Sequence, residues 1–137
     1  MVAGSLAKKL QLKPGQRAAL LNAPAGFPEA LAPLPEGVAL RPASDGDLDF
    51  VLLFVPNMAD LQERLGAAAR AVKYDALLWI AYPKGSAKTG TDLNRDRLWA
   101  AVGERGLAAV TLVSLDDVWS AMRFRPTERV GQEARRL

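Results

Sequence analysis

The chain has 137 residues, the size of one ordinary domain. Half of the residues are hydrophobic and 24% are charged, so the composition excludes a disordered chain. With no cysteine and no histidine, it also excludes disulfides, thiolate metal sites and catalysis by either side chain. The net charge of +3 comes from the second half of the chain. We therefore expect a globular fold.

We expect no targeting segment in the first residues. They carry two lysines, and the apolar stretch around these is too short for a secretory signal. No window reaches the roughly 20 apolar residues that a membrane crossing needs. The sequence therefore predicts a cytoplasmic protein with no membrane partner.

The N-terminal forty residues predict four short elements. Ser5 is a candidate N-cap for a helix over 6–12. The apolar run 17–22 lies between proline and glycine residues, as is typical of a buried strand. The prolines that follow leave room for one helical turn near 28–31. Residues 37–40 are a candidate edge strand.

The middle of the chain carries the clearest pattern. Residues 50–55 are six consecutive apolar residues, as in a strand of a parallel sheet that helices cover on both faces. The next helix is expected from Asn57 to about Val72, with Lys73 near its end, where the helix dipole favours positive charge. The strand 76–81 completes a right-handed βαβ unit.

The last third predicts one helix and two strands. Asp92 or Asn94 caps the helix, which ends near Gly106. Strands are expected at 108–115 and 118–124. Because the link between these two strands is so short, they should be antiparallel neighbours.

These elements predict a single α/β domain over residues 1–126. Its architecture is a three-layer Rossmann-like sandwich, with a mostly parallel sheet of five or six strands and an antiparallel strand near one end. Residues 127–137 follow as a basic C-terminal tail, either frayed or forming a late helix.

The order of strands and helices resembles a known fold family. The strands within 49–56 and 77–83, each followed by a helix, and the two closing strands resemble the C-terminal half of Rossmann-like methyltransferases. Four segments are also similar to an uncharacterised bacterial family of small proteins that is described only as a domain of unknown function; these are 13–27, 82–84, 91–96 and 116–124. The resemblance implies the fold and supplies no reaction.

The sequence departs from methyltransferases at their cofactor motif. Those enzymes bind S-adenosylmethionine with a glycine-rich turn after the first strand and an acidic residue that holds the ribose. The comparable turn here, 22–26, has one usable glycine, and Arg41 stands at the end of the plausible second strand. We therefore expect no cofactor and no catalytic residues for methyl transfer.

A binding site is expected where the parallel strands end, because ligands of open α/β sheets bind at the carboxyl edge. Lysines and hydroxyl groups beside a helix N-terminus suit a phosphate or a carboxylate. The candidate ligand-binding residues are Asn22, Asn57, Lys84, Ser86, Lys88, Thr89 and, in support, Arg123. Arg123 shares one face of the last strand with Trp119, from which it reaches either the ligand edge or the indole.

Simpler interpretations stand beside these. The loop 85–91 is also typical of a solvated surface loop. Its glycines have the spacing of a phosphate loop, but the required Lys-Ser/Thr after the second glycine is missing. Asp92 and Asp96 could do acid–base work or hold magnesium, but we favour capping and dipole roles for them. We predict no metal site.

The leading functional hypothesis is a non-catalytic module that binds a small anionic or nucleotide-like ligand or a protein partner, including a second copy of itself. A degenerate methyltransferase-like enzyme is the first alternative. A nucleic-acid-associated protein that uses the arginine-rich tail is the second, and we do not expect nucleic acid as a partner.

Overall fold

The computed structural model describes residues 4–85 and 90–130 of the chain. Its centre is one six-stranded sheet with the order β2-β1-β3-β4-β6-β5. The strands are β1 (Arg17–Leu21), β2 (Ala39–Leu40), β3 (Leu48–Phe54), β4 (Val72–Pro83), β5 (Leu107–Ser114) and β6 (Trp119–Pro126). Only β6 runs against its neighbours, between β4 and β5. The predicted mixed sheet, mostly parallel with an antiparallel strand near one end, is confirmed.

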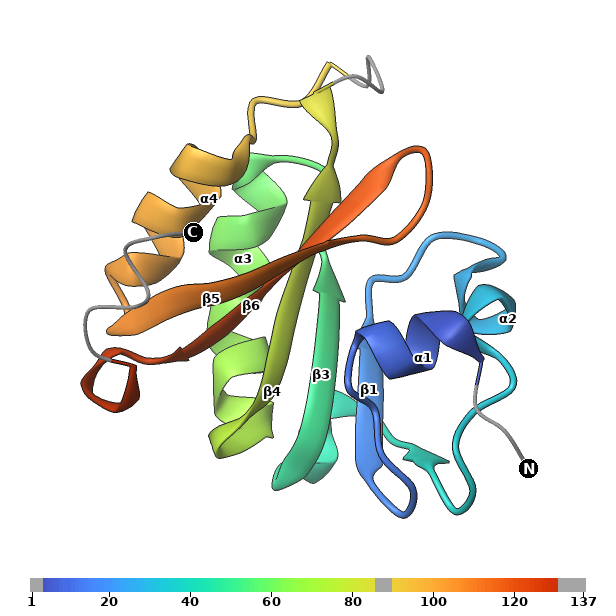
Figure 1. The fold of residues 1–137 in the computed structure, drawn as a ribbon. Coiled ribbons are helices and arrows are strands. Elements are labelled where there is room, and N and C mark those ends of the chain that lie inside the picture. The colour runs from blue at the N-terminus through green and yellow to red at the C-terminus, as the bar shows by residue number, and fades with distance from the viewer. Residues whose placement is uncertain (1–3, 86–89, 131–137) are drawn as a thin grey trace.

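Helices cover both faces of the sheet, as Figure 1 shows. The helices are α1 (Ser5–Lys9), α2 (Phe27–Leu31), α3 (Met58–Ala71) and α4 (Arg95–Gly103), with the short 3-10 helices η1 (Ala43–Asp45) and η3 (Thr127–Arg129). One hydrophobic cluster lies between the sheet and the α3 and α4 layer, and a second lies between the sheet and α1 and α2. In the described part of the chain, no helix has the length and apolar character needed to cross a bilayer.

The two central strands are parallel, and their paired central segments are interior. Val51 of β3 pairs with Leu78 of β4, and every residue from Phe50 to Val55 is 0% exposed. Because neighbouring side chains point to opposite faces, such a continuous apolar run needs cover on both sides. The prediction of a buried parallel pair is therefore confirmed.

The predicted bounds of α3 are confirmed, because Asn57 is the N-cap and Val72 is the C-cap, whereas the placement of Lys73 at the helix end is wrong. The Asn57 carboxamide oxygen accepts the Asp60 amide at 2.8 Å, which caps the helix as predicted. The helix ends at Ala71, because the chain passes directly into β4 at Val72. Lys73 is thus a strand residue, and its Nζ contacts the Asp49 carboxylate at 2.7 Å instead of the helix end.

Two other helix termini differ from the sequence prediction. Ser5 does not cap α1: it lies inside the helix, and Gly4 occupies the N-cap without a side-chain bond. Of the two candidates for α4, Asn94 is the cap, because its side chain accepts the Arg97 amide. The last turn of α4 ends at Gly103, before the predicted Gly106.

The C-terminal hairpin forms as predicted. β5 and β6 are antiparallel along their whole length. In the connection, one carboxylate oxygen of Asp116 accepts the amides of Val118 and Trp119, both at 2.8 Å. An aspartate that bonds the backbone two or three residues ahead is a common turn device, so Asp116 stabilises the turn between β5 and β6.

A charged cluster fixes the start of β4 to the end of β6. Asp75 has the positive φ of 58° and lies where the β3–β4 register shifts. Arg125 donates two hydrogen bonds to its carboxylate, at 2.8 and 2.9 Å, and Arg129 of η3 lies at 3.4 Å. The Thr127 amide also bonds the Gly106 carbonyl. These contacts join residues 127–129 to the sheet.

We expect Asp75→Asn to lower the free energy of unfolding by about 1 kcal/mol near neutral pH, because it breaks the bidentate ion pair while asparagine tolerates positive φ. The Arg125 hydrogen bond is the main reason that the pKa of Asp75 is lowered. Its contribution is therefore present above about pH 4, the unfolded pKa, and is lost as the pH falls through the lower folded pKa.

Urea unfolding of wild type and Asp75→Asn at neutral pH and near pH 2 measures this effect. Asp96→Asn is the control, because the Asp96 side chain is 81% exposed. The free energies of unfolding of wild type and Asp75→Asn should differ at neutral pH and become equal near pH 2. A difference that stays constant down to pH 2 would contradict the ion-pair explanation.

Candidate functional site

The carboxyl ends of the parallel strands meet at one edge of the sheet. Asn22 follows β1, Asn57 follows β3, Lys84 follows β4 and Ser114 ends β5. This is the edge at which open α/β sheets bind ligands. The sequence predicted three of these four residues, and Ser114 was missed.

A row of three hydroxyl groups crosses this edge on the face covered by α3 and α4. Tyr82 of β4 pairs with Ser120 of β6, which in turn pairs with Ser114 of β5. Residues directly opposite each other in a sheet point to the same face, about 5 Å apart. The next row inward, which includes Ile80 and Met122, belongs to the core on the same side. We call Tyr82, Ser114 and Ser120 the hydroxyl row.

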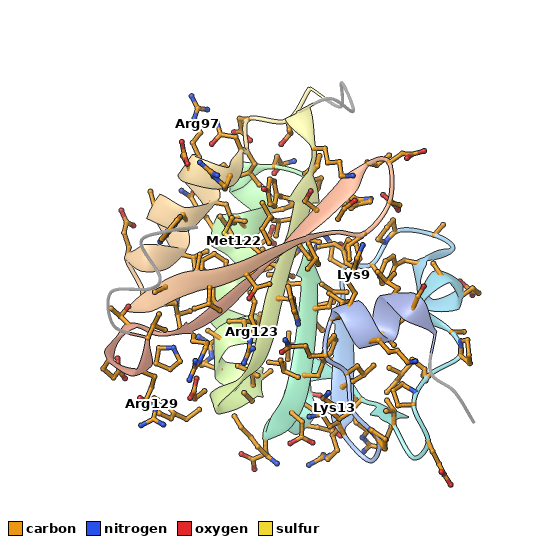
Figure 2. All side chains as sticks on the ribbon, in the orientation of Figure 1. Lys9, Lys13, Arg97, Met122, Arg123 and Arg129 are labelled. Atoms are coloured by element: carbon orange, nitrogen blue, oxygen red, sulfur yellow. The ribbon has the colours of Figure 1, made fainter. Side chains whose placement is uncertain are left out.

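Lys84 lies beside this row. Its Nζ donates to the Ser114 Oγ at 2.6 Å, and its backbone amide bonds the Val118 carbonyl at 2.7 Å. Lys9 of α1 also reaches Ser114, donating from Nζ to the backbone oxygen at 3.0 Å; Figure 2 shows Lys9 on its helix. Within residues 4–85 and 90–130, no carboxylate lies within 4.0 Å of either ammonium group. Neither ammonium group therefore forms an ion pair in this part of the chain.

Tyr82 supplies a neutral donor at the other end of the row. Tyr82 is only 6% exposed, and its burial raises the pKa of the phenol. At the start of α4, Arg95 lowers this pKa and Asp96 raises it, both by less than burial does. The phenol thus keeps its proton at neutral pH. Neither the Tyr82 nor the Ser120 hydroxyl has a hydrogen-bond partner among the residues that the structure describes. Both are free to bind a ligand.

Aromatic side chains fill the opposite face of the same edge. Phe54, the last residue of β3, packs edge-on against Phe27 with ring centroids 4.6 Å apart and against Trp119 at 5.1 Å. All three belong to the α1 and α2 side of the core. Phe27 opens α2 directly after the 22–26 turn, where a glycine-rich cofactor turn would leave space. We call Phe27, Phe54 and Trp119 the aromatic trio.

The second strand also lacks the position that would hold a ribose. β2 pairs only with Arg17 and Ala18, and the Arg41 amide bonds the Ala18 carbonyl. β2 therefore ends three residues before β1 does. The Arg41 side chain binds Asp45 at 2.6 Å.

The remaining predicted residues at this edge make structural contacts. The Asn22 amide nitrogen donates to the Phe54 carbonyl at 2.9 Å, and Asn57 caps α3. Asp92 accepts the Met58 amide at 2.8 Å, which ties the loop before α4 to the start of α3. Asp96 contacts Arg95. In the described segments, no three acidic side chains gather as a metal site.

Arg123 lies apart from Lys84. It shares the α1 side of β6 with Trp119, as predicted, but pairs with Trp79 in mid-sheet, four residues from the start of β6, and its Nη1 donates to the Gln11 side chain at 2.9 Å. The Nε is buried without a partner in the structure described, and burial lowers the pKa of the guanidinium. The predicted ligand-binding residues Ser86, Lys88 and Thr89 lie outside the described residues.

Comparisons with known proteins agree with this fold. No protein-family model matches the sequence, and no curated protein matches it significantly. Among solved structures, the fibrillarin pre-rRNA processing protein of Methanococcus jannaschii aligns with a TM-score of 0.53 and 13% identity, over 84% of this chain and 68% of that chain. A fibrillarin in complex with Nop5p aligns with a TM-score of 0.52 and 10% identity, over 82% and 73%.

These neighbours have methyltransferase-like folds, and at such identities the likeness shows the fold alone. The Rossmann-like, methyltransferase-like architecture expected from the sequence is therefore confirmed. The match to fibrillarin covers more than the predicted C-terminal half of such a fold.

Proposed function

We propose that this chain is a methyltransferase-like domain that binds a small anionic ligand at the carboxyl edge of its sheet, in front of the hydroxyl row, without transferring a methyl group. The observation that carries the proposal is the Lys84 ammonium, which lies against Ser114 with no carboxylate near it in the described residues. A phosphate or carboxylate would accept hydrogen bonds from the ammonium and from the Tyr82 and Ser120 hydroxyls, whereas the Ser114 hydroxyl already donates to the Asp116 carbonyl at 3.4 Å.

The proposal that this chain transfers no methyl group rests on the opposite face of the sheet. The aromatic trio occupies the space beside the first turn, and β2 is too short to hold a ribose. A methyltransferase-like enzyme stays the second candidate, because the fold of the solved neighbours favours it. As the sequence predicts, we place the protein in the cytoplasm and in the family of unknown function that it resembles.

Thermal unfolding with added ligand separates these two candidates. We expect inorganic phosphate, pyrophosphate or a nucleotide to raise the melting temperature, since a ligand at 100 times its Kd adds about 2.7 kcal/mol. Lys84→Ala should weaken binding about tenfold or more, because it removes a charged hydrogen bond. Tyr82→Phe and Ser120→Ala should each weaken it less.

Lys13→Ala is the matched control, because Lys13 is an exposed lysine that precedes β1, at the opposite edge of the sheet. It should leave binding unchanged. Stabilisation by S-adenosylmethionine alone would favour the enzyme. Equal anion binding by wild type and Lys84→Ala would remove the proposed site.

A further inference from the structure

Two arginines, one in α3 and one just after α4, meet over the buried Gly66 of α3. A Cβ placed on Gly66 would lie 3.1 Å from Nη1 of Arg70 and 3.3 Å from Nη2 of Arg105. Arg70 is one turn along α3 from Gly66, whereas Arg105 follows α4. The two nitrogens are therefore no more than 6.4 Å apart, the sum of these distances. The missing side chain at Gly66 makes this approach possible.

Neither guanidinium group has an ion-pair partner in the part of the chain that the structure describes. Among the described residues, Arg70 and Arg105 form no ion pair within 4.0 Å and no side-chain hydrogen bond. Two like charges at this separation repel each other unless an anion lies between them. A guanidinium presents its N–H groups as a fork, which matches the oxygens of a phosphate.

A groove between α3 and α4 is lined in part by Arg105, whereas Arg70 lines a separate groove beside η1. Its volume is about 230 Å³, enough for a small oxyanion, and its lining residues are Leu61, Gln62, Leu65, Ala101, Glu104 and Arg105. Gln62 lies one turn before Gly66 on the same side of α3 and adds an amide donor. Glu104 is the one acidic lining residue of the groove, and it opposes a bound anion.

We propose that Arg70, Arg105 and Gln62 form a second anion site, over Gly66, that takes the phosphate group of a small molecule. This site lies between α3 and the residues that follow α4, separate from Lys84 and the hydroxyl row. Bidentate contacts from two arginines give it a preference for a tetrahedral phosphate over a carboxylate of the same charge.

Amide chemical-shift titration of the full chain tests this site residue by residue. We expect inorganic phosphate, at constant ionic strength, to give saturable shifts at Gly66 and Arg105 that chloride does not give. Glycerol 3-phosphate in a parallel arm distinguishes a phosphate monoester from free phosphate as the preferred form. Arg70→Gln with Arg105→Gln should weaken the binding at least tenfold, and Glu104→Gln should strengthen it.

Arg64→Gln is the matched control, because Arg64 is an exposed arginine of the same helix. It should leave the affinity unchanged, and Lys84→Ala should leave the Gly66 shifts unchanged. The proposal is overturned if phosphate gives no saturable shift at Gly66, or if the double arginine variant binds as the wild type does.

Gly66→Ala provides a variant that does not lose stability. Alanine favours the helix interior over glycine, and the two guanidinium ends that its Cβ meets are flexible, so the melting temperature should rise by about 2–4 °C. The same methyl group displaces both guanidiniums, so phosphate binding over α3 should weaken several-fold. Stronger or unchanged phosphate binding in Gly66→Ala would contradict the proposed position of the ligand.

Discussion

Phe54→Ala should lower the free energy of unfolding by about 3–5 kcal/mol, the usual cost of truncating a fully buried phenylalanine. Phe54 is 0% exposed and is the central ring of the aromatic trio, so the change removes both edge-on contacts. Such a loss is a large share of the 5–15 kcal/mol that stabilises a typical domain. Urea unfolding at neutral pH measures it.

Phe54→Leu is the milder companion variant, because it keeps most of the buried volume while removing the ring. It should cost clearly less than Phe54→Ala. If both variants unfold at the same urea concentration as the wild type, the aromatic trio does not fill the carboxyl edge of the sheet. The argument against a cofactor on that face would then fail as well.

Trp79→Phe should lower the free energy of unfolding by about 2–3 kcal/mol, through a smaller ring and a lost hydrogen bond. The Trp79 side chain is fully buried, and its indole nitrogen donates to the Leu10 carbonyl at 3.0 Å. Leu10 is the C-cap of α1, so this bond fixes the helix to β4. Phenylalanine leaves the carbonyl without a partner.

Amide hydrogen exchange identifies the consequence of that loss. Residues of α1 should exchange faster in Trp79→Phe, while those of α3, on the other face, should keep their relative protection. Trp99→Phe is the matched control, because Trp99 is a partly buried tryptophan of α4. Equal effects of the two substitutions on α1 would contradict the role of the indole bond.

The sheet could be predicted because its strands carry their own signal. A run of six apolar residues from Phe50 indicates a strand covered on both faces, whichever helices cover it. The short link through Asp116 fixes β5 and β6 as antiparallel. The ends of the helices were less predictable. Serine is a common N-cap residue, yet Gly4, which precedes Ser5, is the N-cap of α1.

The candidate site was predictable only in part. Lys84 follows a recognisable strand, and that placed it at the carboxyl edge. Ser114 and Ser120 lie in two different strands, and only the register with Tyr82 brings their hydroxyls into one row. Each serine alternates with apolar neighbours, which indicated its face but not its partner. Arg123 was assigned to the correct face and yet lies in mid-sheet, four residues away from the edge.

The aromatic trio had no signal in the sequence. Phe27 belongs to a proline-rich segment, and its contact with Phe54 depends on how that segment folds over the sheet. The sequence shows that residues 22–26 lack a glycine-rich turn, but it does not show which side chains occupy the space beside that turn. Long-range packing of this kind needs the tertiary structure.

The most direct measurement for the central claim is an amide chemical-shift titration of the wild-type chain with pyrophosphate and, separately, with S-adenosylmethionine. The account predicts saturable pyrophosphate shifts at Lys84, Ser114 and Ser120 that Lys84→Ala abolishes and Lys13→Ala preserves, and no saturable shift from S-adenosylmethionine in residues 22–27. Saturable binding of S-adenosylmethionine at residues 22–27, with no response of Lys84 to pyrophosphate, would contradict it.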